Sequence, residues 1–324
     1  MIKKIARAHT NIALIKYWGK ADAKQRLPLM SSLSMTLDAF YTDTYLEAAT
    51  ENTFYLNGIK QANRASERVF ALLALLNERY GKSTHYQVRS YNTVPTAAGL
   101  ASSSSAFAAL VGAFDHYYQL ELSPRTLSRL ARMGSGSATR SIFGGFAIWQ
   151  KGHDDASSYA YPLDEQPELD LHLLAIELNT APKAISSTAG MALAQSSPLF
   201  AGWLTRNELE LTEMTQAIAS KDFTQLGQLA ELNANEMHAM NLTAQPGFTY
   251  FEPATITLMQ LVRQWRIEGI EVYYTLDAGP NIKLLCQLKN VKIITERLAS
   301  VFDNVKIINT SFGPGLSYRN VSCR

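Results

Sequence analysis

The stretch Pro95–Ser105 is rich in small and hydroxyl-bearing residues, and an Ala-rich segment of helical character follows it directly. Small side chains let a backbone approach a ligand closely, and the first amides of a helix are free donors that favour anions. Serine hydroxyls add donors, and one of them could ligate Mg²⁺. The stretch therefore suits the triphosphate of ATP, although no Walker Gly-Lys-Ser/Thr occurs. Taken alone, it is equally well a Ser-rich cap on a buried helix.

A second polar stretch, Gly134–Arg140, combines two glycines with Ser135 and Ser137 and reads as a loop. Both hydroxyls can bind phosphate, and the guanidinium of Arg140 can hold a carboxylate or phosphate through two parallel hydrogen bonds. The alternative is a flexible turn followed by an arginine on a solvated face. Considered alone, the stretch favours that alternative.

The rest of the chain predicts elements that would position these residues. Strands are expected over 31–49, 169–178, 272–276, 282–288 and 305–309. Helices are expected over 61–80, 102–118, 123–133, 253–268 and 291–301, with two more between 198 and 242 that separate near Asp222. A β-β-α-β succession after a helical pair is typical of an α+β domain. We therefore expect a boundary near residue 181, with domains over 1–181 and 182–324.

Composition narrows the function classes. The chain has 324 residues, 47% of them hydrophobic, which is ample for a large core. A formal net charge of +2 without Lys/Arg runs argues against nucleic acid as a partner. No apolar run reaches the roughly 18 residues that span a bilayer, the first residues lack an apolar signal core, and the two cysteines form no CxxC pair. We expect a cytoplasmic protein that binds no membrane.

Four motifs occur in order along nearly the whole chain: Ala8–Lys20, Pro95–Ser105, Ser135–Arg140 followed by Gly144-Gly145, and Tyr274–Asn281. Together they resemble the diphosphomevalonate decarboxylase family of the GHMP kinase superfamily. Other GHMP kinases share the Gly-Leu-Ala-Ser-Ser loop but not the first string. The resemblance implies an α+β GHMP-kinase fold, in which an S5-like ATP-binding domain and a ferredoxin-like domain enclose the active site. It also implies a homodimer.

The resemblance further implies a reaction. The family uses ATP and Mg²⁺ to convert mevalonate 5-diphosphate to isopentenyl diphosphate, CO₂, ADP and phosphate, in the mevalonate route to isoprenoids. The C3 hydroxyl is first phosphorylated, phosphate leaves, and the carboxylate is then lost as CO₂.

The resemblance assigns roles to the residues nearest this chemistry. Asp277 matches the catalytic carboxylate, as a base or mainly as the group that orients the hydroxyl, since phosphoryl transfer needs little early proton abstraction. Alone, Asp277 would be read as a turn residue. Arg140 is expected to hold the substrate carboxylate, with Asn11 holding Arg140. Tyr17 and Lys20 are expected at the diphosphate or the reacting end, which makes Lys20 a further catalytic candidate.

The remaining expected contacts concern phosphate groups. Ser135 and Ser137 are expected to bind substrate phosphate. The expected ATP-binding residues are Ser90, Asn92, Gly99, Leu100, Ala101, Ser102, Ser103, Ser104 and Ser105. Among them, Ser103 is expected to meet the γ-phosphate and the metal ion, although the long serine run could shift that role. Some bacterial members carry an Arg before Gly-Met in a substrate loop where this chain has Thr188. Lys183 is a candidate for the missing diphosphate contact.

Two other classes remain as alternatives. A mevalonate or phosphomevalonate kinase would share the ATP loop, but it would not need Tyr17, Lys20, Arg140 and Asp277 together. An S5-like RNA-binding protein would show a basic patch with exposed aromatics, which the near-neutral charge argues against. The motifs leave open whether the substrate carries one phosphate or two.

Overall fold

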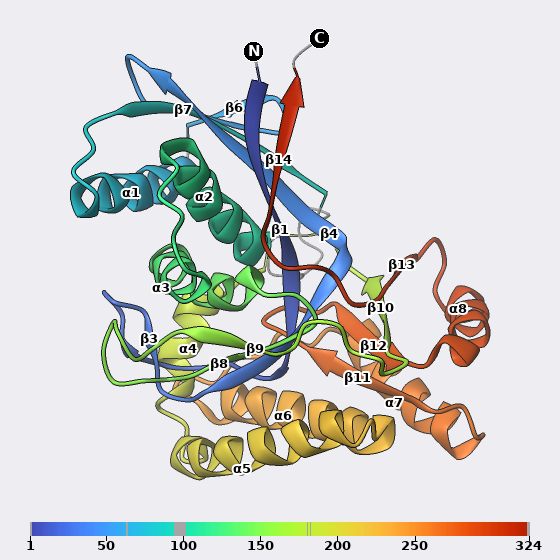
Figure 1. The fold of residues 1–324 in the computed structure, drawn as a ribbon. Coiled ribbons are helices and arrows are strands. Elements are labelled where there is room, and N and C mark those ends of the chain that lie inside the picture. Colours follow the sequence, from blue (N-terminus) through green and yellow to red (C-terminus); the bar gives the residue numbers. More distant parts are fainter. Residues whose placement is uncertain (1, 63, 94–101, 180, 182, 323–324) are drawn as a thin grey trace.

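The computed structural model describes residues 2–62, 64–93, 102–179, 181 and 183–322 (Figure 1). The expected ATP-binding residues Gly99, Leu100 and Ala101 lie outside these ranges. The chain forms two main sheets with helices packed on them, which confirms the α+β class. A short hairpin of β2 (Lys20–Asp22) and β3 (Leu27–Pro28) stands apart from both sheets.

The first sheet has the strand order β14-β1-β4-β7-β5-β6, with β8 paired to β4 and β9 paired to β8. Its strands are β1 (Ile2–Ile15), β4 (Ser32–Ala49), β5 (Thr53–Leu56), β6 (Ile59–Gln61), β7 (His85–Asn92), β8 (Phe146–Trp149), β9 (Ala160–Asp164) and β14 (Ser317–Ser322). All pairs are antiparallel except β5 with β7. In Figure 1, β1 and β14 run side by side although they come from opposite ends of the sequence.

Helices α1 (Arg64–Arg79), α2 (Ser102–Tyr118) and α3 (Pro124–Gly134) cover one face of this sheet (Figure 1). The Ala-rich α2 lies closest to the sheet, because its small side chains let it pack against β1 and β4. Ser123 caps α3 by accepting a hydrogen bond from the amide of Thr126, and Pro124 occupies the first turn. The stretch after α3, expected to be a loop, is a buried 3₁₀-helix, η1 (Gly136–Ile142).

The second sheet is antiparallel, with the strand order β11-β12-β10-β13. Its strands are β10 (His172–Glu177), β11 (Val272–Leu276), β12 (Ile282–Cys286) and β13 (Lys306–Thr310), and its helices are α4 (Ser187–Ala194), α5 (Phe200–Ala219), α6 (Phe223–Thr243), α7 (Pro253–Ile267) and α8 (Leu288–Val301). Buried side chains from β1 and β4 share one core cluster with others from β10, α5 and α6. No helix in the described part of the chain is long and apolar enough to cross a membrane.

The two sheets do not divide the chain at one point. Strand β10 precedes the boundary expected at residue 181, yet it pairs with β12 and β13 of the second sheet. Strand β14 follows the whole second sheet and returns to pair with β1 of the first. The strands of the two sheets therefore do not form two consecutive blocks of sequence, and the domains over 1–181 and 182–324 stay a prediction.

Helix α6 approaches the second sheet at Gly227. A Cβ atom there would overlap the ring of Tyr273, which is 4% exposed. We expect Gly227→Ala to lower the free energy of unfolding by about 1–3 kcal/mol, because overpacking forces the ring or the helix to move. Gly202→Ala on α5 is the matched control, since a Cβ there has no neighbour within 4 Å. Chemical denaturation of both variants tests this, and equal stabilities would contradict the close approach.

Candidate active site

The centre of the site is an ion pair between residues far apart in the sequence. Lys16 follows β1, and its Nζ lies 2.9 Å from Oδ1 of Asp277, which follows β11. The Lys16 side chain is 1% exposed and that of Asp277 is 23% exposed, so the carboxylate is still accessible. Lys16 Nζ also donates to the carbonyl of Ala13 at 2.7 Å, and its backbone amide donates to Oδ1 of Asn233 on α6 at 2.7 Å. These contacts fix the ammonium group beneath the carboxylate.

Cations outnumber the carboxylate at this centre. Burial opposes ionisation of Asp277, but Lys16, Lys283 and Arg140 outweigh it and hold the pKa of this carboxyl below its usual value. Burial, with the charges of Lys16 and Lys183, lowers the pKa of Lys283 to about 8, against the opposing effect of Asp277. A buried excess of positive charge is costly unless an anion binds. The arrangement therefore suits an anionic substrate.

Arg140 is the second buried charge of the site. It lies on η1, is 2% exposed, and donates to the hydroxyl of Ser32 and, at 3.3 Å, to Oδ1 of Asn11. Asn11 in turn donates to the Ser137 carbonyl at 3.0 Å and to the Ser141 hydroxyl at 2.8 Å. The structure thus brings together the pair in which Asn11 was expected to hold Arg140.

One donor of Arg140 is unused. Its Nε is buried, and no atom of the described chain accepts a hydrogen bond from it. Burial lowers the pKa of Arg140 to about 10, with Asp277 and Tyr17 opposing that effect. A guanidinium that is buried, charged at neutral pH and incompletely bonded is arranged to receive a carboxylate or phosphate oxygen.

Three serine hydroxyls meet where α2 begins. Ser103 Oγ lies 3.1 Å from Ser135 Oγ, which lies 3.3 Å from Ser137 Oγ. The first turn of α2 thus stands against η1, with its free amides and these hydroxyls together. Such a set suits phosphate oxygens, and a half-buried hydroxyl at Ser103 can also be a ligand for Mg²⁺.

The next two serines are more deeply buried. The side chains of Ser104 and Ser105 are fully buried, and Ser105 Oγ is 2.8 Å from the hydroxyl of Thr42 on β4. Ser104 Oγ has no hydrogen-bond partner among the residues that the structure describes. Ser102, by contrast, is exposed at the start of the helix.

The expected nucleotide contacts on β7 are also bonded within the protein. Ser90 Oγ is 2.8 Å from the Thr44 hydroxyl, and the backbone amide of Asn92 donates to Oδ1 of Asn57 at 2.8 Å. Ser90 is buried, and Asn92 is half-buried at the end of the strand. The described geometry places Asn92 nearer to the surface than Ser90.

Tyr17 and Lys20 line another side of the site. The Tyr17 ring packs on Trp149, with centroids 4.7 Å apart, and a Cβ at Gly136 would lie 2.7 Å from the Tyr17 ring. The lack of a side chain at Gly136 therefore allows the ring of Tyr17 to lie against η1. Gly136 stands between Ser135 and Ser137 in the sequence. The Tyr17 hydroxyl is buried and unpartnered within the described residues.

Lys20 and Lys183 both reach the start of α4. Lys20 Nζ has a long contact of 3.5 Å with Thr188 Oγ1. Lys183 Nζ donates to the Ala278 carbonyl at 2.8 Å and to Ser187 Oγ at 3.0 Å. Lys183 therefore links the loop of Asp277 to the start of α4, next to the residue that Lys20 approaches.

Sequence reasoning missed Lys16 and Lys283. Both stand within apolar strand sequences, Ile-Ala-Leu-Ile-Lys and Ile-Lys-Leu-Leu, where a lysine is out of place unless it has a buried partner. This interruption of an apolar strand was the available signal. In the structure, Lys16 and Lys283 are each only 1% exposed.

Two models of known domain families match most of the chain. The model of the diphosphomevalonate decarboxylase-like N-terminal domain matches residues 8–160, and that of the mevalonate 5-diphosphate decarboxylase C-terminal domain matches residues 173–318. The diphosphomevalonate decarboxylase of Ganoderma lucidum is 35% identical over 338 residues, which cover 95% of this chain and 84% of that protein.

Solved structures extend the comparison to the fold. The mevalonate diphosphate decarboxylase from Enterococcus faecalis, described with a mevalonate diphosphate mediated ATP binding mechanism, superposes with a TM-score of 0.92 at 44% identity, covering 99% of this chain and 100% of that one. A structure described as MDDEF in complex with MVAPP, AMPPCP and magnesium gives a TM-score of 0.93 at 45% identity, with coverage of 99% and 100%. These neighbours have the GHMP-kinase fold. The chain belongs to the diphosphomevalonate decarboxylase family.

Proposed function

We propose that this protein catalyses the ATP-dependent decarboxylation of mevalonate 5-diphosphate to isopentenyl diphosphate. The observation that carries the proposal is the meeting of the Lys16–Asp277 ion pair with a buried Arg140 whose Nε is unused. A carboxylate for the substrate hydroxyl and a guanidinium for the substrate carboxylate are the two groups this reaction needs. The name of the Enterococcus faecalis enzyme supports the same reaction, as do the MVAPP, AMPPCP and magnesium in the second solved structure.

The proposed mechanism assigns the hydroxyl to Asp277. Its accessible carboxylate accepts the hydrogen bond of the C3 hydroxyl, orients that oxygen and takes up its proton as the new O–P bond forms, while Lys16 keeps the carboxylate ionised and fixed until then. Bound ATP with Mg²⁺ supplies the phosphoryl group that turns this hydroxyl into a leaving group, and Ser103 with the first amides of α2 would hold them.

Arg140 acts at the other end of the reacting unit. Its free Nε and adjacent Nη hold the substrate carboxylate in place until the C–C bond breaks. The electron pair of that bond forms the new double bond as phosphate leaves C3, so CO₂ departs from the guanidinium without a change in protonation. Positive charge from Lys16 and Lys283 stabilises the departing phosphate.

The remaining groups are proposed to bind phosphates. Tyr17 and Lys20, with Ser135 and Ser137, are placed to hold the diphosphate of the substrate. Lys183, beside the Asp277 loop, is placed to contact the transferred phosphate.

Product stoichiometry tests the proposal. We expect turnover to require both ATP and Mg²⁺ and to release ADP and CO₂ in equal amounts, because phosphorylation and decarboxylation are coupled on one substrate. Parallel assays with mevalonate, its 5-phosphate and its 5-diphosphate, with coupled ADP detection and trapped ¹⁴CO₂, measure both products. ADP release without CO₂ would show a kinase instead.

We also propose a homodimer in the cytoplasm. Family membership supports both, and the buried free thiol of Cys286 is compatible with a reducing compartment. Light scattering coupled to size-exclusion chromatography measures the mass in solution.

A further inference from the structure

Arg26 is a partly buried guanidinium that lacks an anionic partner. It lies in the turn between β2 and β3, and it forms no hydrogen bond or ion pair with any residue the structure describes. Burial lowers its pKa, and the nearby Tyr17 only partly opposes this effect. A cation withdrawn from water without a counter-charge costs free energy. A buried cation of this kind is therefore expected at a site where a bound ligand supplies the missing negative charge.

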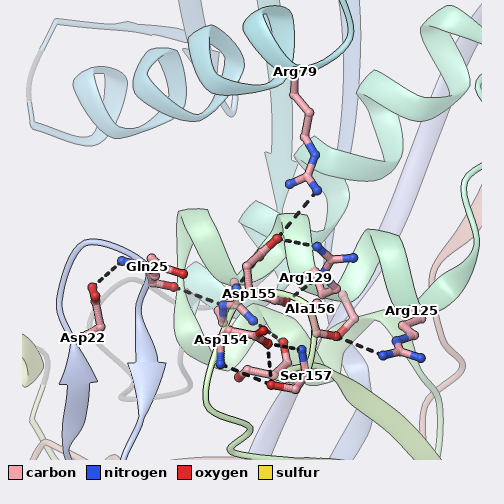
Figure 2. A network of polar contacts seen from close by, with 12 residues as sticks. Asp22, Gln25, Arg79, Arg125, Arg129, Asp154, Asp155, Ala156 and Ser157 are labelled. Carbon is pink, nitrogen blue, oxygen red and sulfur yellow. Dashed lines mark hydrogen bonds and ion pairs between the residues drawn. The ribbon is translucent and has the colours of Figure 1, made fainter.

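The backbone that carries Arg26 is held firmly. Arg26 has φ of 53°, in the left-handed region that is uncommon for a non-glycine residue. Just before it, the amide of Gln25 donates to Oδ1 of Asp22 at 2.7 Å, and the carbonyl of Gln25 accepts from Nε of Arg132 at 3.1 Å. Arg132 is fully buried and pairs with Asp155, the centre of the network in Figure 2.

That network connects the turn to the body of the protein. Figure 2 shows Arg79 and Arg129 also directed at Asp155, while Gln25 and Asp22 lie at its other edge. The turn is therefore not a free surface loop. Its backbone is held by buried Arg132, which belongs to a partly exposed ion-pair cluster that has no part in the proposed chemistry, and this contact limits where Arg26 can reach.

Arg26 belongs to the Tyr17 and Lys20 side of the site. Lys20 pairs with Pro28 across the hairpin, two residues from Arg26, and the pKa of Lys20 is lowered by burial and by the charges of Arg26 and Arg68. Neither Lys20 nor Arg26 forms an ion pair with a carboxylate in the described chain. Two cations and the unpartnered Tyr17 hydroxyl are thus gathered without an anion.

The start of α4 lies in the same region. Thr188 Oγ1, in the first turn of α4, is the atom that Lys20 Nζ approaches at 3.5 Å. Lys183 Nζ is already bonded to the carbonyl of Ala278 and to Oγ of Ser187, the residue before Thr188. Lys20 and Arg26 are therefore available to an anion that binds beside α4.

We propose that Arg26, together with Lys20, binds the terminal phosphate of the substrate. This specificity role rests on the proposed function, because it assumes a substrate with a diphosphate end. A guanidinium binds phosphate oxygens through two parallel hydrogen bonds. The second phosphate of a diphosphate adds about one further negative charge, which Arg26 and Lys20 would neutralise.

Arg26→Gln tests the role, with Lys24→Gln as the matched control. Lys24 is an exposed lysine of the same turn, so its replacement removes the same charge. We expect Arg26→Gln to raise KM for mevalonate 5-diphosphate about ten- to a hundredfold while kcat changes less than about threefold, because the terminal phosphate is remote from C3. Inhibition by inorganic pyrophosphate should weaken in parallel, and Lys24→Gln should resemble the wild type.

Restoration provides the second arm. The double variant Arg26→Gln, Thr188→Arg carries the guanidinium on α4 instead of on the β2–β3 turn. We expect its KM for mevalonate 5-diphosphate to return to within about threefold of the wild-type value. Arg26→Lys should fall between the wild type and Arg26→Gln, and circular dichroism melts of all variants exclude unfolding as the cause. Unchanged KM and pyrophosphate inhibition in folded Arg26→Gln would overturn the inference, as would a fall in kcat with KM unchanged.

Failure of the two proposals is distinguishable. A wild-type protein that releases no CO₂ from mevalonate 5-diphosphate refutes the proposed function itself. Normal wild-type turnover, with Arg26→Gln and Lys24→Gln alike, refutes only the role of Arg26.

Discussion

Asp277→Asn is expected to lower kcat about a hundred- to ten-thousandfold with little change in ATP affinity. The amide keeps the size of the carboxylate but loses the charge that orients and polarises the C3 hydroxyl. Such an interaction counts mainly in the transition state, so the loss should appear in kcat rather than in binding. Steady-state kinetics and direct nucleotide titration measure the two effects separately.

The control for this variant concerns the partner of Asp277. Removing the carboxylate leaves the buried ammonium of Lys16 without its counter-charge, which destabilises the protein as well as the reaction. Thermal melts of Asp277→Asn, with and without Lys16→Met, separate stability from catalysis. Asp303→Asn is a matched exposed substitution. A kcat near the wild-type value in folded Asp277→Asn would reduce Asp277 to a turn residue.

Arg140→Lys is expected to lower kcat/KM by roughly ten- to a hundredfold or more. A planar guanidinium can hold Ser32, Asn11 and a substrate carboxylate at once, whereas one ammonium group cannot reproduce that geometry. Loss of a charge-assisted hydrogen bond costs about 1.5–3 kcal/mol, and 1.4 kcal/mol corresponds to a factor of ten. ATP binding should barely change, and steady-state kinetics with nucleotide titration provide the measurement.

A substrate analogue makes the assignment specific. A molecule that keeps the diphosphate but lacks the carboxylate should bind the wild type and Arg140→Lys about equally. Arg125→Lys, at an exposed arginine of the network in Figure 2, is the matched conservative control. If Arg140→Lys weakens the analogue as much as the substrate, then Arg140 holds phosphate and its proposed role is wrong.

Local signals in the sequence predicted every described α-helix except α4, but among the described strands only β4, β10, β11, β12 and β13. The two helices expected to separate near Asp222 do so, because its side chain accepts from the amide of Gln225 and caps α6. Strand β11 covers the residues expected for it, and β12 ends two residues earlier than expected. Capping and apolar periodicity are encoded within a few residues, so a single sequence is enough to find them.

Long-range contacts set the limit of that reasoning. Nothing near Lys16 in the sequence indicates that Asp277 lies 2.9 Å away, because the two meet only when the sheets pack together. The burial of Ser105 depends similarly on the packing of α2 against β4, where its hydroxyl meets that of Thr42. The motifs identified Asp277 and Arg140 as candidates, but the buried cations that tune their pKa values required the fold.

The pairing of β1 with β14 has a consequence for synthesis of the chain on the ribosome. Lys4 pairs with Asn320, so the outer edge of β1 stays uncovered until β14, which follows the whole second sheet in the sequence, has been translated. An open strand edge can pair with other chains, which makes the nascent protein vulnerable to aggregation while the second sheet is still being made. Pairing β1 with β14 also closes a very long loop, and the conformational entropy lost in closing it adds to the free-energy cost of folding. Completion of the first sheet therefore waits for residues 317–322, even though its other strands emerge early.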